Sequence, residues 1–195
     1  MHTIDPLQDR RVLARPGDEG FTLIELLVVL LIIGILLAIA IPTFLSTTKS
    51  ANNTSAQADL KTALTGADTY FMTSGSQSYS YIDTASGGTS TISTVGTGLT
   101  YVSGSAAADS SSGPRVISMY VTDNGNVIVM TALSHGSMDC WGVLDIKTTL
   151  GTALDHETAV GTYYFVVPGS SATACIAQSV TPTVANISAT AFPHG

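Results

Sequence analysis

The sequence predicts an α+β protein in which one long N-terminal helix packs on a C-terminal antiparallel β-sheet. Residues 21–41 form an apolar run, and a helical pattern continues from it to about residue 74. The region after residue 113 instead holds β-rich runs separated by turn residues. A long helix followed by a loop and then by consecutive strands indicates a helix layer that covers one face of a sheet.

The apolar run is long enough to cross a membrane and contains one charged residue, Glu25. About twenty residues at ~1.5 Å each span the ~30 Å hydrocarbon core of a bilayer. A carboxylate inside that core costs roughly 2.5–3.5 kcal/mol on insertion scales. No Lys, Arg or His lies within the run. The partner of Glu25 must therefore be newly created or come from another molecule.

Cleavage between Gly20 and Phe21 would create such a partner. It frees an α-amino group at Phe21, four residues before Glu25 and close to one helical turn away. That amine can pair with Glu25 of its own chain or of a neighbouring subunit. Gly20 suits a cleavage site because a backbone without a side chain enters a protease active site unobstructed.

Residues 20–25, Gly-Phe-Thr-Leu-Ile-Glu, resemble the class III signal of type IV prepilins and pseudopilins. The resemblance covers about residues 17–45. It implies cleavage after Gly20 by a prepilin peptidase, N-methylation of Phe21, and pairing of Glu25 with the Phe21 amine of a neighbour in a filament. It also implies an inner-membrane pilus assembly platform as a partner. Residues 18–19 are acidic, whereas many family members carry Lys or Arg there.

Two other kinds of segment share part of this pattern. A conventional secretory signal places its apolar stretch before the cleavage site. Here the apolar run follows Gly20 and stays in the mature chain. A plain single-span anchor explains the length and hydrophobicity, but neither Glu25 nor the Gly-Phe junction. The pattern favours a prepilin signal over both.

Residues 42–74 continue the helix in amphipathic form. Apolar residues repeat there at helical spacing: Leu60, Ala63, Leu64, Ala67 and Phe71. This stripe predicts the face that covers the sheet. Pro42 removes a backbone hydrogen bond and predicts a kink, with Gly34 as a second soft point; many major pilins carry a glycine and a proline at the matching places. Gly75 offers a stop.

Residues 75–113 are rich in Ser, Thr and Gly, which predicts a variable, exposed loop with short strands at 91–95 and 99–102. Residues 114–195 predict the antiparallel sheet, with strands at 115–121, 126–132, 138–146, 160–167 and, last and short, 173–180. The Thr-Asp-Asn-Gly sequence before residue 126 is a strong hairpin signal, since Gly125 can adopt a positive φ.

Cys140 and Cys175 are the only cysteines, and both follow the apolar run. An even number in an oxidising compartment favours a disulfide, worth roughly 3–4 kcal/mol for a loop of this length. Two buried thiols or a metal pair are the alternatives, although two cysteines without matching histidines make a poor zinc site. Many type IV pilins close a C-terminal region with a disulfide. Trp141, next to Cys140, is expected on the opposite face of its strand.

Charge excludes one class of partner. The net charge is −7, and four basic residues follow Gly20: Lys49, Lys61, Arg115 and Lys147. Nucleic-acid binding needs clustered Lys and Arg, so no nucleic acid is expected. Arginines at positions 10, 11 and 15 favour a cytoplasmic N-terminus, with the chain beyond residue 41 outside the cytoplasmic membrane.

Chemical clusters are sparse. Residues 155–157, Asp-His-Glu, lie side by side in the chain and are interpreted as a solvated turn. His135 lies near Ser134 and Asp139 without the signature of a nucleophilic site. No glycine loop carries the lysine of a phosphate site. We therefore expect no catalytic residue, metal or cofactor.

The resulting hypothesis is a filament subunit and not an enzyme. Residues 1–20 are a cytoplasmic leader, residues 21–41 a membrane span that becomes filament core, and the remainder the globular part, which reaches the cell surface. The protein would form a homopolymer with other pilin subunits. A pseudopilin or minor pilin of a type II secretion or competence apparatus is an alternative, and a membrane-tethered binding domain is a more distant one.

Overall fold

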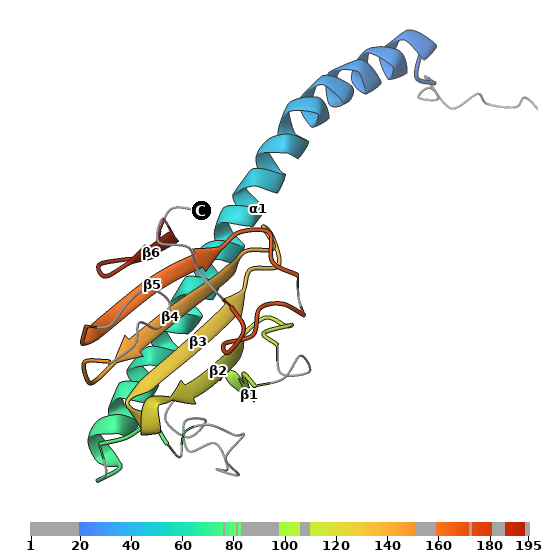
Figure 1. Cartoon of the computed structure of the whole chain (residues 1–195). Coiled ribbons are helices and arrows are strands. Elements are labelled where there is room, and N and C mark those ends of the chain that lie inside the picture. The colour runs from blue at the N-terminus through green and yellow to red at the C-terminus, as the bar shows by residue number, and fades with distance from the viewer. Residues whose placement is uncertain are drawn as a thin grey trace, which may run out of the picture. The chain divides into compact units, whose positions relative to one another are not determined.

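The computed structural model describes residues 20–75, 77–80, 82, 98–105, 110–150, 159–171, 173–180 and 186–193. The chain divides into two compact units, Met1–Thr43 and Phe44–Gly195. The first unit contains the apolar beginning of helix α1 (Leu23–Thr73), and the second contains the rest of α1 and a six-stranded sheet (Figure 1). The predicted α+β class is confirmed.

Helix α1 is 51 residues long and runs through Gly34 and Pro42 without interruption. Pro42 has no N–H to donate, and the hydroxyl of Thr43 donates to the Ile39 carbonyl at 3.1 Å one position along. The helix ends at Thr73, and Gly75 follows with φ +69°. Gly75 is thus the predicted stop, while the kink at Pro42 stays a prediction.

The second half of α1 buries the predicted stripe. Leu60, Ala63 and Ala67 are fully inaccessible to solvent. They pack in one core cluster with side chains from the inner face of the sheet: Ile117, Met119, Ile128, Met130, Trp141 and Val143. Apolar spacing in the sequence therefore identified the contact between helix and sheet correctly.

The sheet follows chain order. Its strands are β1 (Thr100–Ser103), β2 (Val116–Thr122), β3 (Val127–Leu133), β4 (Cys140–Ile146), β5 (Gly161–Val167) and β6 (Ile187–Ser188). Four of the five neighbouring pairs are antiparallel, but β1 pairs with β2 in parallel, Thr100 opposite Val116. The predicted antiparallel sheet is confirmed for β2 to β6, and β1, from the segment predicted as a loop with short strands, adds a parallel strand at the edge.

The β2–β3 hairpin turn holds the start of the loop that follows α1. Asn124 has φ 52° and Gly125 φ 86°, so the predicted positive φ at Gly125 is confirmed. The backbone N–H of Tyr79 donates to the Gly125 carbonyl at 2.7 Å. The hydroxyls of Ser78 and Ser80 donate to the Asn124 carbonyl. The β2–β3 turn and the loop after α1 are therefore held together by direct hydrogen bonds.

Residues 75–113 are accordingly not an exposed loop throughout. Tyr79 and Ile82 are fully buried, and Leu99 and Tyr101 are at most 9% exposed. These apolar side chains join the inner core cluster, and apolar burial outweighs the hydroxyl-rich composition around them. The predicted strand at 99–102 corresponds to β1, whereas the one at 91–95 lies outside the described residues.

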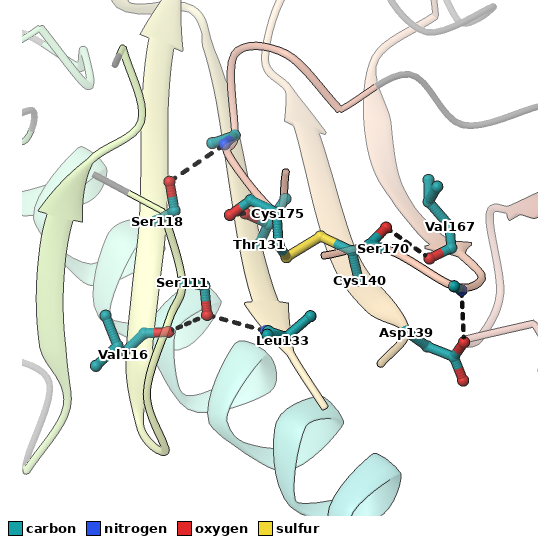
Figure 2. Close-up of a disulfide and its surroundings, with 12 residues drawn as sticks. Ser111, Val116, Ser118, Thr131, Leu133, Asp139, Cys140, Val167, Ser170 and Cys175 are labelled. Atoms are coloured by element: carbon teal, nitrogen blue, oxygen red, sulfur yellow. Dashed lines mark hydrogen bonds between the residues drawn. A yellow bond between two sulfur atoms is a disulfide. The ribbon is translucent and has the colours of Figure 1, made fainter. Parts of the chain in front are cut away.

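Residues 173–180 cross the outer face of the sheet and form turns instead of the predicted last strand. Figure 2 shows the Cys140–Cys175 disulfide that attaches this segment to β4, with a Cα–Cα distance of 5.4 Å. The hydroxyl of Ser118 on β2 accepts the Ala177 N–H at 3.2 Å. The Ser111 N–H donates to the Cys175 carbonyl at 3.0 Å. We call residues 173–180 the outer strap.

The strand prediction failed because several backbone N–H groups of the outer strap donate within its own turns, as those of Ser179 and Val180 do to the Ile176 carbonyl. The predicted disulfide is confirmed, and both sulfurs are fully buried. Cys140 belongs to the outer core cluster and Trp141 to the inner one. The expectation that these neighbours face opposite sides of β4 is therefore confirmed as well.

Candidate functional site

The start of α1 is a capping box built from Thr22 and Glu25. The Glu25 N–H donates to the Thr22 hydroxyl at 3.3 Å, and the Thr22 N–H donates to Glu25 Oε2 at 2.9 Å. The Thr22 hydroxyl also donates to Oε2 at 2.7 Å. In a capping box these reciprocal bonds satisfy N–H groups that have no partner inside the helix.

This geometry occupies only one oxygen of Glu25. Oε2 accepts both bonds from Thr22, whereas Oε1 accepts none from the residues that the structure describes. The carboxylate is thus fixed in direction and still has capacity for a further donor. Sequence reasoning identified Glu25 but missed Thr22, although Thr-x-x-Glu before an apolar run is the signature of a capping box.

The helix that follows is apolar and exposed all round. Phe21 is 88% exposed, and every residue from there to Ser50 is classed as exposed in the isolated chain. By length and composition, α1 can cross a membrane. A helix that is hydrophobic on all sides belongs in a membrane or among other helices.

The two glycines of this segment have no packing role within the chain. A Cβ placed at Gly20 or at Gly34 would meet no atom within 4 Å. Gly34 therefore leaves a low point on the helix surface, where another helix can approach closely. Gly20 lies two residues before Thr22, the first residue of the capping box. The roles predicted for Gly20, Phe21, Glu25, Gly34 and Pro42 stay predictions.

The other candidate clusters give no site among the residues that the structure describes. Residues 155–157 lie outside the described residues. Ser134 is buried and His135 exposed, and the backbone N–H of Ser134 donates to the Asp139 carbonyl in a turn. Within the described part of the chain, no group of three or more His, Cys, Asp and Glu side chains is arranged to hold a metal ion.

Two comparisons with known proteins found matches, and the first of them lies on this segment. Residues 15–41 match the family described as "Prokaryotic N-terminal methylation motif". The chain is also similar to the "Type IV major pilin protein PilA" of Myxococcus xanthus (strain DK1622), with 45% identity over 56 residues. That match covers 29% of this chain and 26% of the relative, so the chain spans about a quarter of the length of the curated relative that it matches. No solved structure matches.

Proposed function

We propose that this chain is a structural subunit of a type IV pilus-like filament, made as a prepilin and processed after Gly20. One observation carries the proposal: Glu25 sits on the first turn of an exposed apolar helix that continues into a folded α+β domain. A carboxylate there is costly in a membrane. Cleavage supplies each subunit with one amine, at Phe21, that can offset the cost.

Assembly would use the free capacity of the carboxylate. Thr22 holds Oε2, which leaves Oε1 for the Phe21 amine of a neighbouring subunit. Helix packing would add the burial of apolar surface, worth about 25 cal/mol per Å² when removed from water, although in lipid close packing and hydrogen bonds supply more of the drive. The charge pair would then determine which subunits can join the filament and in what register their helices pack.

The remaining regions follow from this scheme. Residues 1–20 would be a cytoplasmic leader, and residues 21–41 a membrane span that becomes filament core. Residues 42–195 would form the exported domain at the filament surface, locked by the Cys140–Cys175 disulfide. The partners would be further copies of the chain, a prepilin peptidase and an inner-membrane assembly platform.

Similarity to a protein named as a type IV major pilin supports the major-subunit form of the proposal. The test is N-terminal sequencing and intact mass of protein sheared from cells. An abundant sheared chain that begins at N-methylated Phe21 supports it. A processed chain found only in trace amounts would indicate a minor pilin or pseudopilin. An uncleaved chain that stays with the membrane would overturn the proposal in favour of a tethered domain.

The role of Glu25 is tested separately. Glu25→Ala should leave membrane insertion intact while sharply reducing the sheared filament fraction. Leu26→Ala is the matched control, because it trims the next exposed helix residue without changing charge. Normal filament yield from Glu25→Ala would contradict the pairing mechanism.

A further inference from the structure

A cluster of one lysine and two carboxylates joins the end of α1 to the sheet. Lys147 follows directly after β4, and its Nζ lies 2.7 Å from Oδ1 of Asp68 on α1. The same Nζ lies 2.9 Å from Oδ2 of Asp145, which is on β4 and only 2% exposed. The Tyr79 hydroxyl donates to both carboxylates, at 3.2 Å to Asp68 and 2.5 Å to Asp145.

We propose that Lys147 and Asp68 react to form an intramolecular amide, an isopeptide bond that links α1 covalently to the sheet. Lys147 Nζ is the nucleophile and Cγ of Asp68 is the electrophile. The proposal is independent of the filament function, since it concerns only the fold of the exported domain.

The second carboxylate is what distinguishes this cluster from a simple ion pair. One lysine needs one counter-charge, yet Asp145 lies on its other side, nearly inaccessible to water. Thr162 fixes Asp145 by donating to Oδ1 at 2.8 Å. Asp145 is thus held as a base with Oδ2 directed at Nζ, which is the arrangement that a buried nucleophile requires.

The resting cluster holds Nζ in its charged form, and burial is the influence that opposes this charge. The rings of Phe71 and Tyr79 lie 5.3 and 5.9 Å from it. Burial lowers the pKa of Lys147, while the hydrogen bonds to Asp68 and Asp145 raise it and prevail, so the resting state is an ion pair. The reaction must begin with movement of a proton along one of the two short hydrogen bonds, and a half-buried site brings the neutral pair closer in energy.

The step balances as a condensation. Lys147 gives one ammonium proton to Asp68, which becomes the neutral acid. Nζ attacks Cγ of Asp68 while Tyr79 donates a hydrogen bond to the carbonyl oxygen on which negative charge develops. The nitrogen then gives its second proton to Asp145, the Cγ–OH bond breaks, and Asp145 passes that proton to the departing hydroxyl, which leaves as water. In the product, the amide N–H still has Asp145 as its acceptor.

The test is the mass of the reduced full-length chain, measured after prolonged incubation and after its N-terminus has been read. The wild type should be one water molecule, about 18 Da, lighter than its sequence requires. Trypsin should fail to cut after Lys147 and should release a branched peptide that contains Asp68. A wild type of full mass with normal cleavage after Lys147 would overturn the proposal.

Three variants identify the participants. Lys147→Arg keeps the positive charge but should have full mass. Asp145→Asn keeps the shape, removes the base, and should also retain full mass. Asp68→Asn should still form the bond, now with loss of ammonia, about 17 Da. Asp59→Asn, a carboxamide substitution elsewhere on α1, is the matched control and should show the wild-type loss of water. A loss of mass in Lys147→Arg would refute the assignment of Lys147 as the nucleophile.

Discussion

Removing the Cys140–Cys175 disulfide should destabilise the folded α+β domain by several kcal/mol. The two cysteines are 35 residues apart, and a loop of that length restricts the unfolded chain by about 3.8 kcal/mol in the chain-entropy description. Both sulfurs are fully buried, so their loss in Cys140→Ala/Cys175→Ala adds roughly 1 kcal/mol of packing cost. The expected total is about 4–5 kcal/mol.

Urea unfolding of the full-length chain in detergent micelles measures this difference. Trp141 is the only tryptophan, is buried, and lies next to Cys140, so its fluorescence reports on the sheet. With a slope of about 2 kcal/mol per M, the midpoint should fall by roughly 2 M. The wild type with reductant in the titration should move towards the variant. A loss below about 1.5 kcal/mol would refute the view that the outer strap depends on its cross-link.

Three further outcomes are expected. Gly125→Ala should lower the thermal unfolding midpoint well below that of Gly169→Ala. Both glycines have a positive φ, but only at Gly125 would a new Cβ lie 2.0 Å from a serine hydroxyl. Thr22→Val should reduce filament yield less than Glu25→Ala does, since it removes a helix cap worth about 1 kcal/mol but leaves the carboxylate; Thr22→Ser should restore the yield. Folding stability should fall as pH rises above the ordinary tyrosine value of 10.0, because burial and Asp145 raise the pKa of Tyr79. Tyr79 binds its proton more tightly in the folded chain, so its contribution is complete below pH 10 and is lost in alkali. A pH titration of Trp141 fluorescence with no transition there would contradict this.

Local patterns predicted the parts of the fold that depend on local physics. Helical spacing from Leu60 to Phe71 identified the buried face of α1, and Asn124-Gly125 identified the hairpin, because side-chain period and positive φ are properties of short segments. Glu25 was identifiable for the same reason, since one carboxylate in an apolar run is visible without a structure. Thr22 could have been found from the capping-box spacing.

The buried network could not be predicted in this way. Tyr79 and Asp145 are 66 residues apart, and a tyrosine in a Ser-rich stretch reads as an exposed loop residue. Lys147 and Asp68 are 79 apart. In the sequence, each of these four residues looks like an ordinary surface or loop residue. Only the fold brings Asp68, Tyr79, Asp145 and Lys147 together.

The outer strap could be predicted from the sequence only in part. Every residue of β3 and β4 is buried. Their sequences do not alternate between apolar and polar residues, as those of a sheet with one solvent-exposed face do. They read Val-Ile-Val-Met-Thr-Ala-Leu and Cys-Trp-Gly-Val-Leu-Asp-Ile. That pattern already requires a cover on the face opposite α1. Its identity rests on contacts across the chain: Cys175 bonds to Cys140, and Ser118 accepts the Ala177 N–H. The strands therefore predict that a cover is needed. The covering segment itself resembles a strand in composition, because its turns and its contacts with the sheet face leave no periodic pattern in its own sequence.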